Sequence, residues 1–163
     1  MSFKMRPEKI MIFVEGSQES ILAAQYAVCM AKWLDCTLVG AYVVDIKTLE
    51  ELTRAKIFVK MEEMDYEKSL EEDGHRYLNY VRNLAEAKGV FIETEILKGE
   101  IYKEIIRIIE QEDIDILVMG ELEEPESRRD FYYNESERTF RHSPCPVIVV
   151  KSRDEIKWMY ENL

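Results

Sequence analysis

The sequence predicts an α/β fold in a single domain, with a five-stranded, mostly parallel sheet and helices on both of its faces. Its 163 residues, of which 47% are hydrophobic, are enough to build one sizeable core. Short apolar runs of strand length alternate with longer segments in which apolar residues recur at helical spacing. Because helices separate successive strands, the connections must be crossovers, which are right-handed and leave the strands parallel.

The first half of the chain predicts two strands buried on both faces, with a helix between them. Both strands are continuous apolar runs that end at an acidic residue, Glu15 or Asp45. Ser17 is suited to cap the intervening helix, because its hydroxyl can accept a hydrogen bond from a free N–H of the first turn. The predicted elements are a strand at residues 9–14, a helix with an apolar stripe at residues 21–34, a strand at residues 37–44, and a short helix with a loop at residues 46–60.

The second half predicts three more strands and the helices that join them. Gly89 is expected to end a long helix, since glycine readily adopts the left-handed conformation found there, and Gly99 is expected to form a turn. Pro144 and Pro146 lie at the entrance of the last strand and favour an edge strand, because proline lacks a ladder donor. The predicted elements are helices at residues 61–88, 101–109, 134–141 and 154–162, strands at residues 90–97 (nearer the sheet edge), 114–119 and 147–150, and a loop at residues 121–135.

Charge and cysteine content exclude several classes of protein. The chain has 22 Lys and Arg against 33 Asp and Glu, a net charge of −11, so nucleic acid and membrane are not expected partners. It has no apolar stretch long enough to span a membrane and no N-terminal signal core. Three cysteines without a C-x-x-C pair favour a reducing compartment and argue against disulfides, and two isolated histidines predict no metal site. We therefore expect a cytoplasmic protein.

The six glycines exclude the two common glycine-rich phosphate loops. The closest pair is Gly89 and Gly99, so neither G-x-G-x-x-G nor G-x-x-x-x-G-K-[ST] occurs. In an open parallel sheet of the Rossmann-like type, ligands bind at the carboxyl ends of the strands, where the winding direction reverses. The segments predicted to meet there are Glu15-Gly16-Ser17, Val43-Val44-Asp45 and Met119-Gly120-Glu121.

Glu15 has two interpretations at this position. It can contact a ribose or a magnesium ion, or it can simply be an acid that the dipole at a helix N-terminus stabilises. Glu15 and Asp45 end neighbouring strands, but neither a nucleophile nor a phosphate cradle accompanies them. We therefore do not expect an acid–base catalytic pair.

Several of these segments resemble the universal stress protein (UspA) family. Residues 10–20 (IMIFVEGSQES) and 41–45 (AYVVD) are similar to the opening of a family member. Residues 115–120 (DILVMG), followed by residues 144–150 (PCPVIVV) with Arg141-His142 just before them, are similar to the closing signature of the family. The resemblance extends from about residue 8 to residue 151, and residues 154–162 add a short helix.

The resemblance implies a homodimer, commonly formed through the last strand, and a family divided into members that do and do not bind ATP. Members that bind ATP carry Gly-2x-Gly-9x-Gly-(Ser/Thr) after the fourth strand, where backbone N–H groups surround the phosphates. This chain keeps Gly120, but Glu123, Tyr133 and Asn134 occupy the later positions of the motif. The resemblance therefore implies a member that does not bind ATP.

The expected function is a non-enzymatic stress-response homodimer with no cofactor, acting through an unknown protein or small-molecule partner. An alternative is an ATP- or AMP-binding member that uses magnesium and a rebuilt phosphate loop, in which Arg128, Arg129 and Asn134 hold the phosphates while Val43 and Met119 flank the base. The candidate ligand-binding residues are Glu15, Gly16, Ser17, Val43, Met119, Gly120 and Asn134, and the candidate dimer residues are Val147, Ile148, Val149 and Val150.

An enzyme is the third alternative. Residues 15–20 (EGSQES) distantly resemble the Ser-Gly-Gly-x-Asp-Ser loop of ATP pyrophosphatase-type ligases. Glu15 replaces the opening serine of that loop and Ser17 replaces a required glycine. We therefore expect no pyrophosphate release from ATP, although a weak ATPase activity is left open.

Overall fold

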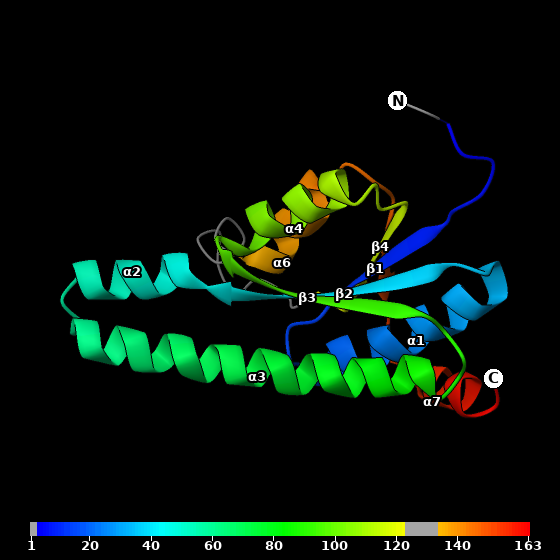
Figure 1. The fold of residues 1–163 in the computed structure, drawn as a ribbon, viewed down its shortest axis with the longest axis horizontal. Coiled ribbons are helices and arrows are strands. Elements are labelled where there is room, and N and C mark those ends of the chain that lie inside the picture. The colour runs from blue at the N-terminus through cyan, green and yellow to red at the C-terminus, as the bar shows by residue number, and fades with distance from the viewer. Residues whose placement is uncertain (1–2, 123–133) are drawn as a thin grey trace.

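The computed structural model describes residues 3–122 and 134–163 and contains the predicted five-stranded sheet (Figure 1). All of the strands are parallel, in the order β3-β2-β1-β4-β5. The winding direction reverses between β1 and β4, which lie side by side although more than a hundred residues separate them in sequence. The strands are β1 (Lys9–Phe13), β2 (Thr37–Asp45), β3 (Ile92–Gly99), β4 (Ile116–Gly120) and β5 (Val147–Val150).

Helices cover both faces of the sheet, as predicted. Figure 1 shows α1, α3 and α7 on one face and α4 and α6 on the other. The helix α2 lies beyond the sheet and packs against the first part of α3. The helices are α1 (Gln18–Leu34), α2 (Ile46–Arg54), α3 (Lys60–Glu86), α4 (Ile101–Gln111), α6 (Glu135–His142) and α7 (Asp154–Glu161).

The protein has two hydrophobic cores, one on each face of the sheet, and the continuous apolar run of β1 contributes side chains to both. Side chains alternate between the two faces of a strand, so Ile10 and Ile12 pack with α1 and α3 whereas Met11 and Phe13 pack with α4. All four side chains are buried. A strand that lies in the middle of a parallel sheet is covered on both faces, which explains why its sequence lacks polar alternation.

Gly89 ends the third helix, as predicted. It has a φ of +71°, and the N–H of Val90 donates to the carbonyl of Ala85 at 2.9 Å, which is the bonding pattern of a helix stop. The helices α1 and α4 end in the same way at Asp35 and Asp113, whose φ values are 56° and 55°. The helix–strand connections are therefore short and locally determined.

The prediction for Gly99 was wrong. This residue is the last ladder position of β3, where it pairs with Asp45 of β2, rather than part of a turn. The strand β3 extends that far because β2 runs to the same edge of the sheet, and ladder pairing with a neighbour determines where a strand ends. For the same reason β4 begins at Ile116 instead of residue 114, opposite Ile10 of β1.

The C-terminal helix α7 packs on α1. Ile156 and Tyr160 are buried in the core that α1 and α3 share, and the Tyr160 hydroxyl donates to the carbonyl of Leu84 at 2.8 Å. Within residues 3–122 and 134–163, no helix combines the length and the apolar character needed to cross a bilayer.

Candidate ligand-binding cleft

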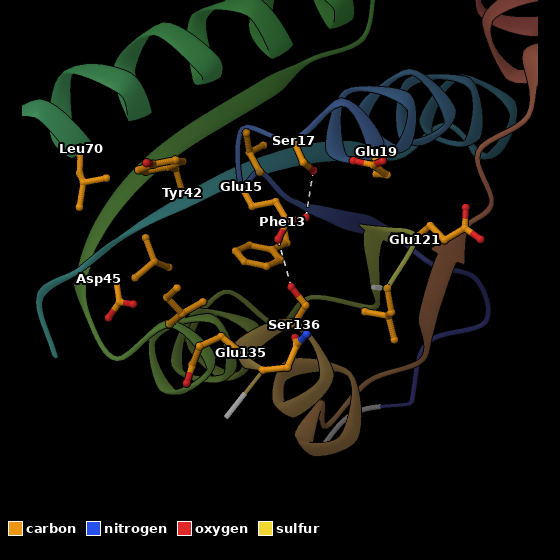
Figure 2. Close-up of a pocket in the computed structure, with 15 residues that line it drawn as sticks. Phe13, Glu15, Ser17, Glu19, Tyr42, Asp45, Leu70, Glu121, Glu135 and Ser136 are labelled. Atoms are coloured by element: carbon orange, nitrogen blue, oxygen red, sulfur yellow. Dashed lines mark hydrogen bonds between the residues drawn. The ribbon is translucent and has the colours of Figure 1, made fainter. Parts of the chain in front are cut away.

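A cleft of about 450 Å³ opens at the carboxyl edge of the sheet, beside the point where the winding reverses (Figure 2). The turn after β1, the end of β2 and the start of α6 all contribute to it, and Leu70 reaches it from α3. One part of its wall is apolar, and five acidic side chains line the rest together with Ser17, Asn134 and Ser136. The apolar residues are Phe13, Val14, Tyr42, Val43, Leu70, Ile101 and Leu122, and the acidic residues are Glu15, Glu19, Asp45, Glu121 and Glu135.

Ser17 is the N-cap of α1, as predicted. Its hydroxyl oxygen accepts from the N–H of Ser20 at 3.1 Å and donates to Glu15 Oε1 at 3.0 Å. Gly16 has a φ of +81°, a conformation that residues with a Cβ rarely adopt, and a Cβ on it would also meet the ring of Tyr77 in α3. The backbone of this turn therefore favours a glycine, whether or not a ligand is bound.

Glu15 connects the two sides of the cleft. Its Oε1 accepts from Ser17, and its Oε2 accepts from the hydroxyl of Ser136 in α6 at 3.0 Å (Figure 2). The hydroxyls of both serines that line the described cleft thus donate to one carboxylate.

The first turn of α6 is capped and holds the neighbouring helix. Asn134 is the N-cap and accepts from the N–H of Glu137 at 3.0 Å. Glu135 Oε2 accepts from the backbone N–H of Tyr102 at 3.0 Å, at the N-terminus of α4. A helix N-terminus is a natural place for an anion, and in this protein an internal carboxylate already bonds to it.

Three basic side chains near the cleft converge on Glu100, whose side chain is 9% exposed. The Nζ atoms of Lys47 and Lys103 each lie 2.7 Å from its carboxylate, and Nη1 of Arg138 lies at 3.4 Å. Burial alone would raise the pKa of Glu100, but the hydrogen bonds from Lys103 and Lys47 outweigh it and hold the pKa below the ordinary 4.5. Arg138 also pairs with Glu135 at 3.1 Å.

Glu121 follows β4 and is held as a carboxylate. It accepts from the N–H of Ser152 at 3.1 Å and from Lys151 at 3.3 Å. These two donors hold the pKa of Glu121 below its ordinary value. The residue directly after Gly120, at the end of β4, is therefore an anion that connects β4 to the segment after β5.

The cleft has a strongly acidic lining. Among the described residues that line it, five are Asp or Glu and none is Lys or Arg. Despite this, the described residues include no group of three or more His, Cys, Asp or Glu side chains arranged to hold a metal ion. The cleft therefore presents a negative potential to any ligand that enters it.

The structure brings four of the seven candidate ligand residues into the cleft wall: Glu15, Ser17, Val43 and Asn134. Gly16, Met119 and Gly120 do not line it. Met119 is 1% exposed and lies in the core between the sheet and α4, on the same face as Phe13 and Val43, so its side chain is buried and does not reach the cleft. Gly120 lies beneath the first turn of α1, where a Cβ would be 2.8 Å from the carbonyl carbon of Glu19.

Sequence reasoning missed several cleft residues. Glu135 and Ser136 follow the predicted N-cap, and an acid in the first helical turn was the available signal for Glu135. Leu70 had no signal, because it is one position of a long amphipathic helix whose place over the cleft depends on tertiary packing. The predictions for Glu123, Arg128, Arg129 and Tyr133 lie outside the described residues.

The predicted edge strand is confirmed, since β5 pairs only with β4 in the described sheet. Val150 is buried, whereas Val147, Ile148 and Val149 are half-buried. Beside this edge lies an apolar groove of about 270 Å³ that includes Tyr26, Ile148 and Met159. The edge thus combines unpaired ladder groups with partly exposed apolar side chains.

Comparisons with known proteins agree on one family. The sequence profile of the Universal stress protein family matches residues 7–151. A universal stress protein of Methanocaldococcus jannaschii is 33% identical over 144 residues, which cover 88% of this chain and 82% of that protein.

Solved structures share the fold. A universal stress protein family member from Burkholderia pseudomallei superposes with a TM-score of 0.71 at 20% identity, over 91% of this chain and 99% of its own. A family member from Arabidopsis thaliana, solved with AMP bound, superposes with a TM-score of 0.62 at 18% identity, over 91% of this chain and 94% of its own.

Proposed function

Because this chain belongs to the universal stress protein family, we propose that it is a non-enzymatic, cytoplasmic stress-response protein that forms a homodimer and does not bind ATP. The cleft above the sheet is then free for a ligand without a phosphate chain, or for a contact with a protein partner. The acidic lining of the cleft carries this proposal.

Internal carboxylates already use the groups that would bind phosphates. Glu135 takes the free N–H at the start of α4, and Glu15 takes the hydroxyls of Ser17 and Ser136. A carboxylate such as Glu135 and a phosphate charge roughly 6 Å away repel by about 3 kcal/mol at an effective dielectric of about 20, and by less where water screens them. A triphosphate in this cleft would therefore need compensating cations, and those nearby are engaged by Glu100 and Glu135.

The side chains available for catalysis also support a non-enzymatic role. Neither His75 nor His142 lines the cleft; His142 packs against the ring of Tyr102 at 5.6 Å. The hydroxyl of Ser17 caps α1, and no histidine or lysine lines the described cleft to activate it. The one base it contacts is the Glu15 carboxylate, which also accepts from Ser136 and bridges the turn to α6.

Nucleotide content tests this proposal directly. Small molecules released by denaturing freshly purified protein should contain no adenosine polyphosphate by mass spectrometry. Stoichiometric ATP in the released fraction would contradict the proposal.

The homodimer rests on the edge strand β5. An exposed edge with apolar side chains is a template for pairing, and two-fold pairing of identical edges satisfies its free backbone groups. Val149→Lys places a charge in that edge and should convert the dimer to a monomer in sedimentation velocity. Phe91→Ser, at an exposed residue outside β5, is the control and should remain a dimer. A Val149→Lys protein that is still a folded dimer would refute this arrangement.

A second candidate is a nucleoside or nucleoside monophosphate, favoured by the apolar wall that Val43, Leu70 and Ile101 form beside the hydroxyls of Ser17 and Ser136. An apolar wall with a few polar groups is typical of small-molecule sites. Since every phosphate adds negative charge, affinity in this cleft should fall in the order adenosine, AMP, ATP. The reverse order would favour the rebuilt phosphate loop with bound magnesium.

A further inference from the structure

The helix α2 and the first part of α3 form a hairpin that projects beyond the end of the sheet (Figure 1). We call residues 54–66 the hairpin tip. Five large hydrophobic side chains there are exposed: Ile57 (65%), Val59 (61%), Met61 (73%), Met64 (60%) and Tyr66 (53%). Large apolar side chains that gather in one exposed segment of a protein indicate an interaction site.

The turn of the hairpin tip is a defined structure. The N–H of Ile57 donates to the carbonyl of Leu52 at 2.9 Å, and Lys56 has a φ of +61°, the left-handed conformation that ends a helix. The ring of Phe58 stacks on the ring of Tyr66, with 5.0 Å between the ring centroids. This stack connects the turn to the first part of α3, so the exposed apolar side chains are presented on an ordered support.

The two arms of the hairpin tip carry opposite charges. Arg54 and Lys56 end the α2 arm, whereas Glu62 and Asp65 lie on the α3 arm. In the described part of the chain, Arg54, Lys56 and Asp65 take part in no ion pair, although Lys60 pairs with Glu63 at 2.9 Å. An apolar centre is thus flanked by unpaired positive charge on one side and negative charge on the other.

We propose that the hairpin tip binds the hairpin tip of a second copy of this chain. In a two-fold contact the same patch meets itself. If the two hairpins lie antiparallel, the α2 arm of each copy faces the α3 arm of the other, so Lys56 and Arg54 meet Asp65 and Glu62 around a shared apolar centre. The charge pattern is therefore self-complementary.

The same charges disfavour an anionic membrane as the occupant. Glu62 and Asp65 lie on the patch itself, and the chain as a whole has a net charge of −11. A contact limited to the hairpin tip buries less than about 1,200 Å², the size of weak and transient complexes. The contact between hairpin tips is independent of the β5 edge. Where both contacts form, the hairpin-tip contact joins β5 dimers into larger assemblies.

Crosslinking locates the contact. In Val59→Cys, a short bis-maleimide should join two copies through residue 59, and peptide mass spectrometry should find that link. Phe91→Cys is the matched control, because Phe91 is exposed to a similar degree (63%) outside the hairpin. Equal crosslinking of both variants, or none at residue 59, would overturn the proposal. Val149→Lys in the Val59→Cys background should keep the link, which separates this contact from the β5 dimer.

Charge exchange tests the antiparallel arrangement. Lys56→Glu and Asp65→Lys should each weaken self-association about tenfold in sedimentation velocity, since two-fold symmetry doubles every lost pair. The double variant restores opposite charges, so its self-association constant should return to within about threefold of that of the unmodified chain. Circular dichroism verifies that each variant is folded. A double variant as weak as the single ones, or binding of the unmodified chain to phosphatidylserine vesicles that Met61→Asp abolishes, would refute the proposal.

Discussion

Adding a single methyl group at Gly120 tests why this glycine is retained after β4. The structure places its Cα under the first turn of α1, and a Cβ would lie 2.8 Å from the carbonyl carbon of Glu19, 2.9 Å from its oxygen and 3.0 Å from the backbone nitrogen of Ser20. These are backbone atoms, so no side-chain rotation relieves the contact. Gly120→Ala must therefore move α1 away from β4.

The cost follows from that displacement. Overpacking a core by one methyl costs about 1–3 kcal/mol, and disturbing the Ser17 cap of α1 adds up to about 1 kcal/mol. We expect Gly120→Ala to lower the free energy of unfolding by about 1–4 kcal/mol. At about 2–4 °C per kcal/mol for a chain of this size, the melting temperature should fall by about 2–16 °C.

Gly89→Ala is the matched control in thermal and urea unfolding. Its Cβ would have no neighbour within 4 Å, so the variant has only the cost of a φ of +71°, about 1–2 kcal/mol. If Gly120→Ala is no less stable than Gly89→Ala, packing against α1 does not explain the glycine, and a role in ligand binding regains support.

Three further substitutions test the groups around the cleft and the C-terminal helix. Glu100→Gln leaves Lys47 and Lys103 without their carboxylate and should lower the free energy of unfolding by about 2 kcal/mol at neutral pH. Because the folded pKa of Glu100 is below its ordinary 4.5, its contribution to stability is fully present above pH 4.5 and is lost as the pH falls through the folded pKa. The urea midpoint of the variant should therefore change less with pH across that acid range than the midpoint of the unmodified chain. The same pH dependence in both proteins would contradict this. Ser17→Ala removes a helix cap and should cost about 0.5–2 kcal/mol in urea unfolding, whereas Ser17→Asn should keep most of the stability, and equal losses would argue against capping. Tyr160→Phe removes the hydroxyl bonded to Leu84 and should cost about 1 kcal/mol, and a loss near zero would show that this bond contributes nothing.

Features encoded by neighbouring residues were predictable from the sequence. The apolar runs of β1 and β2, the cap at Ser17 and the helix stop at Gly89 depend on a few adjacent positions, and the structure confirms all of them. The predictions failed where tertiary pairing decides. The sequence alone cannot show that β2 continues opposite Gly99, so a glycine that belongs to a strand was interpreted as a turn.

The residues of the candidate site also fall into two groups, those that local sequence could locate and those whose place depends on tertiary packing. The rule that ligand sites lie at strand ends located Glu15, Ser17 and Val43 correctly in the cleft wall. It could not show that the Met119 side chain is fully buried in the core below the cleft, or that Glu135 reaches across to the N-terminus of α4. Those facts depend on the orientation of β4 and on the packing of two helices that no local pattern encodes.

The central claim is that the acidic cleft does not accept a triphosphate, and isothermal titration with ATP and magnesium tests it most directly. The account predicts no saturable heat up to about 1 mM ATP, which corresponds to a binding free energy weaker than about −4 kcal/mol. A one-to-one isotherm with a dissociation constant in the low micromolar range would contradict it.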